Sequence, residues 1–355
     1  MKIYHNIYIS IIVLFFSIIV FLCTLYNFGL SKVSNDDTLR KVVIEPGSID
    51  SIAVTLYNNN MIRSKLAFNI YVRLNNKTNL MAATYELSEN MGTKKIVDIM
   101  NKGENSTPEV SITFKEGVNM RGIAELIEEN TNNTKEDVYN LLKDENYLDS
   151  IINKYWFLSN DIKNTNIYYS LEGYLYPNTY SFSSKDATVE EIFEKMLDET
   201  DTRLSKYRTL LEINTLSVHQ ILTLASIVEL EGVTSEERKE IAGVFYNRLN
   251  NNMNLGSDVT TYYGANIDMG ERDLLKSEIT ECNSYNTRCS TFKTLPVSPI
   301  CNPSIDAIEA ALEPSDNDYY YFVADKNKKV YFSKTQEEHN DIINKLKKED
   351  LWYEY

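Results

Sequence analysis

The hydrophobic pattern of this chain begins with a long apolar run and continues with shorter, periodic ones. From Ile7 to Leu25 nearly every side chain is apolar, and about 20 such residues suffice for a helix to cross a bilayer. No small-x-small cleavage site follows, as it would after a signal peptide. We therefore expect residues 1–30 to be a cytoplasmic tip and an uncleaved single-pass anchor in the cell membrane. Few basic residues flank the run, so the extracytoplasmic placement of the body rests on the short N-terminal tail.

Short strand-like and helical patterns alternate beyond the anchor. Residues 31–40 are polar and are expected to form a linker. A β-branched run, a turn and an apolar helical stripe then follow one another twice, at residues 41–57 and 109–130. A further strand-like and a further helical stretch lie between the two copies. This pattern predicts a compact α+β module over residues 41–130.

The rest of the chain has the pattern of a larger mixed domain. Residues 131–166 are expected to be a helical connection, and residues 167–355 a mixed α+β domain. The segment SLEGYLYPNTYSF, Ser170–Phe182, is dense in aromatic and turn residues. Capping-box residues mark several helix starts after it, and DYYYFVADKNKKVYFS has the pattern of a β-hairpin. The predicted class of the whole chain is α+β behind an N-terminal transmembrane helix.

One predicted helix, Ser217–Gly232 with the sequence SVHQILTLASIVELEG, is apolar on most of its circumference. A capping box starts it, and its final glycine is expected to end it in a left-handed conformation. Glu229 and Glu231 are the exceptions to its apolar composition. Two positions on a helix are about 200° apart, so these carboxyls should face opposite sides.

Glu229 falls on the stripe of Leu222 and Ala225, whereas Glu231 stands beside the final glycine, where exposure is expected. Partial burial and the negative end of the helix dipole would both raise the pKa of Glu229 toward the range of a general acid. Alternatively, both glutamates are solvated residues of a helix end, since perturbed carboxyls also occur in structural networks. From this helix alone, both interpretations stay open.

Charge and the remaining chemistry narrow the class of function. The net charge of −15 and the sparse clustering of basic residues argue against a nucleic-acid partner. The three histidines are far apart and no HExxH motif occurs, so no metal or other cofactor is expected. Cys282 and Cys289 enclose a short polar loop, NSYNTR, and outside the cell they could be close enough for a disulfide. Unpaired small side chains are the alternative, and Cys301 is left over in either case.

Together these motifs resemble a known family. The motifs, in chain order, are SLEGYLYPNTYSF, LASIVELEG, IAGVFYNRLN, LGSDVTTYYG, YNT, LP followed by PICNP, and YYYFVAD followed by FSKTQEEHN. Their order and spacing are similar to those of the endolytic murein transglycosylases, the MltG or YceG-like family. The resemblance covers nearly the whole chain and implies an anchor, a small LysM-like module and a C-terminal catalytic domain.

Such enzymes cut the β-1,4 bond between N-acetylmuramic acid and N-acetylglucosamine inside peptidoglycan strands and leave 1,6-anhydro ends. The resemblance thus implies a lytic transglycosylase that acts on peptidoglycan glycan strands and limits the length of nascent strands, with cell-wall synthesis proteins as candidate partners. It implies Glu229, the first glutamate of SIVE-x-E, as the catalytic acid. The implied substrate-binding residues are Tyr174, Asn247, Asp258, Tyr263, Tyr285 and Asn286.

The chain departs from the family pattern in one region. TLPVSPI, Thr294–Ile300, lacks both glycines of the usual GLPPGPI, and Arg288 replaces the last tyrosine of YNTY, which would change how this loop approaches the substrate. Two other functions stay open. A glycoside hydrolase would use Glu229 as acid and Asp258 as base or nucleophile. A membrane-anchored cell-wall binding protein would have no activity.

Overall fold

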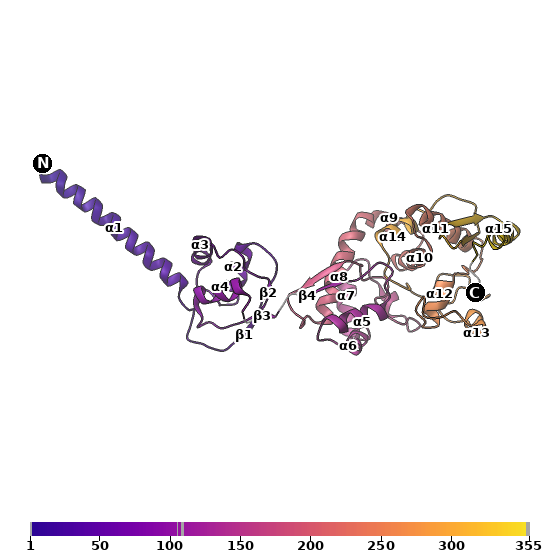
Figure 1. Ribbon diagram of the computed structural model, residues 1–355, viewed down its shortest axis with the longest axis horizontal. Helices are drawn as coiled ribbons and strands as arrows, with labels where there is room; N and C mark the ends of the chain where they lie inside the picture. The colour runs from indigo at the N-terminus through magenta and orange to yellow at the C-terminus, as the bar shows by residue number, and fades with distance from the viewer. Residues whose placement is uncertain (1, 105, 108–109, 353–355) are drawn as a thin grey trace. The chain divides into compact units, whose positions relative to one another are not determined.

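Figure 1 shows the computed structural model of the chain, which describes residues 2–104, 106–107 and 110–352. The described residues form two compact units. Unit 1 contains the chain up to Ser111 together with Ser181–Ala187, and unit 2 contains Ile112–Tyr180 and the chain from Thr188 onward. Helices and strands occur in both units, which confirms the predicted mixed α+β class.

The N-terminal helix α1 (Lys2–Leu30) is the apolar segment predicted as an anchor. Its span Ile11–Leu30 has a mean hydropathy of 2.5 and is long and apolar enough to cross a membrane. Large side chains along it, such as Phe15 and Phe16, are more than 60% exposed. A continuous exposed apolar surface of this kind is unfavourable in water and suits a lipid environment.

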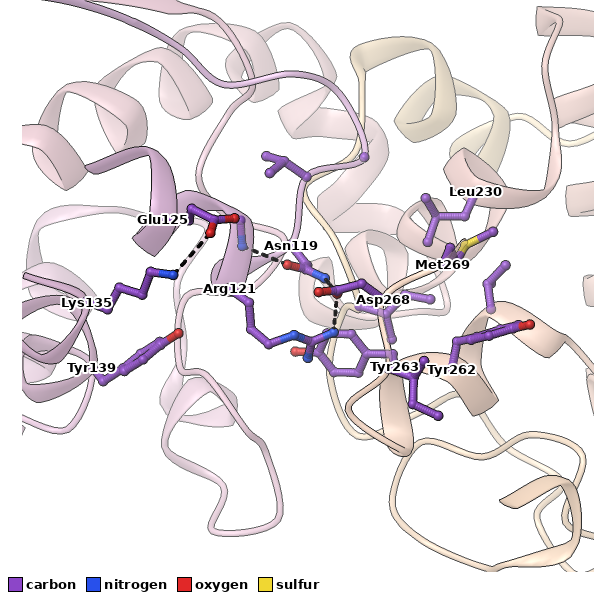
Figure 2. A pocket seen from close by; sticks show the side chains of 16 residues that line it. Asn119, Arg121, Glu125, Lys135, Tyr139, Leu230, Tyr262, Tyr263, Asp268 and Met269 are labelled. Atoms are coloured by element: carbon purple, nitrogen blue, oxygen red, sulfur yellow. Dashed lines mark hydrogen bonds and ion pairs between the residues drawn. The ribbon is translucent and has the colours of Figure 1, made fainter. Parts of the chain in front are cut away.

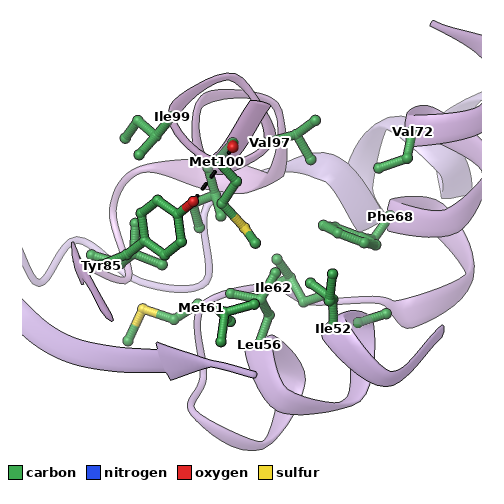
Figure 3. Packing of buried hydrophobic residues seen from close by; sticks show 14 of the residues in the cluster. Ile52, Leu56, Met61, Ile62, Phe68, Val72, Tyr85, Val97, Ile99 and Met100 are labelled. Atoms are coloured by element: carbon green, nitrogen blue, oxygen red, sulfur yellow. Dashed lines mark hydrogen bonds between the residues drawn. The ribbon is translucent and has the colours of Figure 1, made fainter. Parts of the chain in front are cut away.

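Unit 1 is built on a three-stranded antiparallel sheet in the order β1–β2–β3. The strands are β1 (Arg40–Ile44), β2 (Ala83–Leu87) and β3 (Ser106–Thr107), and the helices are α2 (Ile49–Asn58), α3 (Lys65–Leu74) and α4 (Gly92–Lys102). Side chains of the sheet and of all three helices form one hydrophobic core. Figure 3 shows this packing, with the hydroxyl of Tyr85 of β2 directed at the carbonyl of Met100, 3.4 Å away. Helix α3 lies between the two predicted strand–turn–helix copies and belongs to neither of them.

The border between the units differs from the predicted end of the module at residue 130. The second strand–turn–helix copy, β4 (Val110–Thr113) and α5 (Met120–Asn130), belongs to unit 2 from Ile112 on. One reason is that the Phe114 N–H donates to the carbonyl of Asn178 at 2.9 Å. A local pattern predicts that a strand and a helix follow one another, but it carries no information about contacts with residues 60 or more positions away.

Unit 2 contains the remaining helices and strands, apart from the ends of β4 and β5 that belong to unit 1. Its helices are α6 (Lys135–Leu141), α7 (Glu145–Lys154), α8 (Val189–Leu204), α9 (Arg208–Ile213), α10 (Val218–Glu231), α11 (Ser235–Asn250), α12 (Asp258–Gly264), α13 (Lys276–Thr280), α14 (Ile305–Leu312) and α15 (Gln336–Lys348). Strand β4 pairs with β5 (Thr179–Phe182), and β6 (Tyr321–Ala324) with β7 (Val330–Ser333), which is the predicted hairpin. Helix α10 packs on α11, α12 and α14.

Helix α10 begins and ends where the sequence predicts, and its capping box is present. The expected left-handed conformation of Gly232 is wrong, because its φ of −110° and ψ of 140° are those of an extended residue. A Cβ on Gly232 would lie 3.2 Å from the backbone of Arg238. The glycine therefore permits the close approach of α11 to the end of α10, and does not serve as a left-handed cap.

Candidate active site

Glu229, at the end of α10, uses both carboxylate oxygens to join three helices. Its Oε1 accepts from Nη2 of Arg238 on α11 at 2.8 Å. Its Oε2 accepts from the backbone N–H of Ser304 at 2.9 Å and from the Ser304 hydroxyl. Ser304 is the N-cap of α14, so the carboxylate also meets the positive end of that helix. The Glu229 side chain is only 6% exposed, and each of its two carboxylate oxygens has a partner.

Glu231 faces the opposite side of α10. Its Oε1 accepts a 2.6 Å hydrogen bond from the hydroxyl of Ser257, the residue before α12. Among the described residues, its Oε2 makes no hydrogen bond. Burial raises the pKa of Glu231 to about 7; the Ser257 hydrogen bond opposes this rise and the charge of Asp258 adds to it. Glu231 is thus a partly buried carboxyl that exchanges its proton near neutral pH and has one oxygen available.

These contacts confirm one part of the sequence argument and correct another. The two carboxyls do face opposite sides of the helix, as the 200° rotation predicts. The expected exposure of Glu231 is wrong, because its side chain is partly buried and this burial raises its pKa. The reason is tertiary: Arg238 and Ser304 lie on the Glu229 side, whereas Ser257 covers Glu231.

A disulfide-closed loop packs beside Glu231. Cys282 and Cys289 are bonded with a Cα–Cα distance of 5.3 Å, which confirms the expected proximity and excludes the unpaired alternative. Cys301 is a free, buried cysteine. Arg288, next to Cys289, forms a two-point ion pair with Asp258 in the first turn of α12.

Three of the predicted substrate-binding residues are buried inside unit 2. The Tyr174 hydroxyl is 2.8 Å from Nδ1 of His219. The Tyr285 hydroxyl lies 2.9 Å from that of Ser298 and accepts from the N–H of Tyr168 at 3.0 Å. Asn286 is fully buried, and its side chain binds neighbouring backbone and hydroxyl groups. All three side chains are almost fully buried, and their polar atoms are bound to neighbouring groups of the chain.

Of the other three predicted residues, Asn247 and Asp258 lie nearer the surface, whereas Tyr263 is only 4% exposed. Asn247 is half-buried and its Nδ2 donates to the carbonyls of Asn317 and Tyr319, both at 2.9 Å. Asp258 is exposed and paired with Arg288. Tyr263 is the one member of the predicted set that lines the cavity described next.

A cavity of about 480 Å³ lies beside the end of α10 within unit 2. Figure 2 shows Arg121 of α5 and Asp268 pointing toward one another beside Tyr263, with Lys135 and Glu125 paired at the other side. The lining residues are Gly117, Val118, Asn119, Arg121, Gly122, Glu125, Lys135, Tyr139, Leu230, Val259, Tyr262, Tyr263, Ile267, Asp268, Met269 and Ile300. Leu230 stands between the two glutamates in sequence, so the cavity adjoins the end of α10 that carries both. The lining combines aromatic rings, apolar side chains and two ion pairs.

Glu172 is a buried carboxyl that sequence reasoning missed. Its Oε2 accepts from the N–H of Met120 and from the hydroxyl of Tyr263, both at 2.9 Å. Nδ2 of Asn302 lies 3.3 Å from its Oε1. Burial raises its pKa to about 7, against these hydrogen bonds. The available signal was an acidic residue inside the aromatic SLEGYLYP segment, where a buried carboxyl needs several donors. Through Tyr263, Glu172 supports one wall of the cavity.

No group of three or more His, Cys, Asp or Glu side chains among the described residues is arranged to hold a metal ion. Glu231, whose pKa is near 7, accepts from the Ser257 hydroxyl and lies near the Arg288–Asp258 ion pair, and the cavity adjoins the same end of α10 at Leu230.

Comparison with known proteins places these features in a family. The chain matches the YceG-like family over residues 42–345. A Bacillus subtilis (strain 168) protein named endolytic murein transglycosylase is 34% identical over 314 residues, which are 88% of this chain and 86% of that protein. A Streptococcus pneumoniae serotype 2 (strain D39) protein of the same name is 32% identical over 310 residues, which are 83% of this chain and 56% of that protein. The crystal structure of a yceG-like protein from Listeria monocytogenes matches with a TM-score of 0.62 and 38% identity, over 86% of this chain and 99% of that one. The chain therefore belongs to the YceG-like family.

Proposed function

We propose that this chain is a membrane-anchored lytic transglycosylase that cuts peptidoglycan glycan strands internally, with Glu231 as its acid and base. The observation that carries the proposal is the Glu231 carboxyl at the end of α10, which is held by one donor and has a pKa of about 7. Family membership supports the substrate, because relatives 32–34% identical to the chain are named endolytic murein transglycosylases.

The reaction needs a single group that first donates and then accepts a proton. Protonated Glu231 gives its proton to the oxygen of the β-1,4 bond as the bond to C1 of N-acetylmuramic acid breaks and an oxocarbenium-like state develops. The resulting carboxylate takes the proton of the C6 hydroxyl of the same sugar while that oxygen bonds to C1. The products are a 1,6-anhydro end and a free 4-hydroxyl, and no water is consumed. A pKa near 7 suits both transfers at neutral pH.

Glu229 is less suited to this role than the family resemblance implies. Arg238 and Ser304 occupy both of its oxygens, so it offers none to a glycosidic oxygen without breaking the link between α10, α11 and α14. Asp258 is equally engaged, because both its oxygens bind Arg288. This pairing weighs against a hydrolase in which Asp258 activates water or attacks the sugar.

The cavity beside Leu230 is the proposed binding place for part of the glycan strand. Tyr262 offers a ring for the C–H face of a sugar beside the buried Tyr263, and the Arg121–Asp268 pair offers donors and acceptors for hydroxyl and amide groups. From the cavity, a strand would continue past the start of α12 to reach Glu231.

The N-terminal part completes the proposal. Helix α1 would hold the enzyme in the cell membrane with both units on the extracytoplasmic side, where a disulfide is stable. Unit 1 would be a LysM-like module that contacts the glycan. An enzyme fixed at the membrane that cuts inside strands would limit the length of newly made ones, near the proteins that synthesise them.

The test is the chemistry of the products. The full-length protein in detergent micelles is incubated with purified, uncrosslinked glycan polymer, and the new ends are identified by mass spectrometry. We expect 1,6-anhydro ends from internal cuts. Reducing ends would show a hydrolase instead, and binding without new ends would show a cell-wall binding protein.

A further inference from the structure

The loop closed by Cys282 and Cys289 carries the groups that hold the first turn of α12. Nη2 of Arg288 donates to Oδ2 of Asp258 at 2.8 Å, and Nε donates to Oδ1. Such a two-point contact fixes the relative orientation of a guanidinium and a carboxylate more firmly than a single hydrogen bond does. Arg288 is covalently adjacent to Cys289, so the disulfide restricts the backbone from which its side chain extends, and Asp258 holds the guanidinium.

Thr287 adds a second set of contacts between the same two segments. Its carbonyl accepts from the N–H of Gly256 at 3.0 Å, and its hydroxyl accepts from the N–H of Ser257 at 3.0 Å. The hydroxyls of Thr260 and Thr287 are 2.8 Å apart. The loop and the start of α12 thus form one hydrogen-bonded framework, and Ser257 within it donates to Glu231.

We propose that Arg288 is a positioning residue for Glu231: the Arg288–Asp258 pair, held by the Cys282–Cys289 disulfide, places the Ser257 hydroxyl and two opposite charges beside the reacting carboxyl. This inference rests on the proposed role of Glu231. It assigns a purpose to the arginine that stands where the family pattern has the last residue of YNTY. Arg288 acts through other residues and does not itself touch the glycosidic bond.

Three charged groups lie around the Glu231 carboxyl. Asp258, on α12, disfavours the carboxylate form, whereas Arg288 on the loop and Arg248 on α11 favour it. Arg248 donates to the carbonyls of Leu255 and Tyr320, which keep it in place. Loss of Arg288 would remove one cation and leave the Asp258 charge unbalanced, and both changes favour protonated Glu231. Loss of the Asp258 charge would have the opposite effect.

The test is the pH dependence of kcat/KM for Arg288→Gln and Asp258→Asn, measured on polymeric glycan with the full-length protein. The proton donor must be protonated, so activity falls on the alkaline side of its pKa. We expect this alkaline limb to move up by about 0.5 pH unit in Arg288→Gln and down by a similar amount in Asp258→Asn. Arg208→Gln, which removes an exposed arginine paired with Glu212 on α9, is the matched control and should leave the limb in place.

A second pair of variants tests the positioning. Arg288→Lys keeps the charge but loses the two-point contact, so we expect kcat to fall about tenfold with a smaller shift of the limb. The double variant Cys282→Ser, Cys289→Ser removes the disulfide that holds the loop, so kcat should also fall, and KM should change less.

The inference is overturned if Glu231→Gln is inactive and the alkaline limbs of kcat/KM lie at the same pH in the wild type, Arg288→Gln and Asp258→Asn. Full activity of Glu231→Gln would instead overturn the proposed function on which the inference rests. A third outcome would also overturn the inference: Asp258→Asn is inactive, whereas Arg288→Gln is active and its alkaline limb does not move. This result would point to Asp258 as a hydrolytic base.

Discussion

Two carboxyls at the end of one helix lie two residues apart and have contrasting surroundings. Glu229 lies between Arg238 and the N-terminus of α14, and both its oxygens are bound. Glu231 faces α12, where one hydroxyl binds one oxygen and burial raises its pKa. A buried acid can thus hold helices together or exchange protons, and its partners decide which. The first role needs charges that satisfy the carboxylate, and the second needs an environment that keeps it protonated near neutral pH.

The largest expected effect is on catalysis. Glu231→Gln keeps the shape of the side chain but cannot donate or recover a proton, so kcat on polymeric glycan should fall by about 10²–10⁴-fold. The midpoint of thermal unfolding should not decrease, because the uncharged amide suits a buried site. A lowered midpoint with a proportionate loss of activity would assign Glu231 a structural role and remove the contrast.

The next largest effect is on the stability of the fold, and it concerns the side of α10 that carries Glu229. Arg238→Met would leave the Glu229 carboxylate buried without its cation, since the two side chains are 12% and 6% exposed. We expect the free energy of unfolding in denaturant to fall by about 3–5 kcal/mol, while kcat of the remaining folded protein changes little. An unchanged free energy would mean that the ion pair does not hold these helices together.

The raised pKa of Glu231 predicts how stability depends on pH. The carboxyl titrates near pH 7 in the folded chain and near its ordinary value of 4.5 in the unfolded chain. As pH rises from about 4.5 to 7, ionisation therefore favours the unfolded chain. The wild type should lose about 1–3 kcal/mol of unfolding free energy over this window relative to Glu231→Gln, and the difference should be constant above it. If the unfolding free energies of the two proteins changed in parallel with pH over this window, the raised pKa of Glu231 would be contradicted. Glu172 also has a raised pKa, but it is present in both proteins and cancels.

The smallest effect concerns the second partner of Arg238. Asp306 lies 2.6 Å from Nη1 of Arg238 and is 32% exposed, so water screens this pair more strongly. Asp306→Asn should cost about 0.5–1 kcal/mol in the same denaturant assay. A cost equal to that of Arg238→Met would show that Asp306, and not Glu229, is the main partner of the arginine.

The local features of this region could be predicted from the sequence. Ser217 and Gln220 mark the start of α10, and the 3.6-residue period places its two glutamates on opposite sides. The hairpin of β6 and β7, and the proximity of Cys282 and Cys289, also follow from short segments. Each of these features depends on residues that lie within about 16 positions of one another.

The surroundings of the carboxyls could not be predicted in the same way. Ser304 lies 75 residues beyond Glu229, and Ser257 lies 26 residues beyond Glu231. Periodicity gives the side of a helix that a residue faces, but not what packs there. The same limit explains the missed role of Glu172, whose donors Met120 and Tyr263 come from 52 and 91 positions away. It also explains why the border between the units lies at residue 111 and not at residue 130.

The most direct test of the account compares Glu229→Gln and Glu231→Gln in one assay. Both full-length variants, at equal concentrations of folded protein, are given the same glycan polymer, and 1,6-anhydro ends are counted by mass spectrometry over time. The two substitutions are chemically identical, so general effects of losing a carboxylate cancel. We predict that Glu229→Gln forms anhydro ends at a rate within a few-fold of wild type and that Glu231→Gln forms almost none. The opposite result, an inactive Glu229→Gln beside an active Glu231→Gln, would contradict the account and support the assignment of Glu229 that the family resemblance implies.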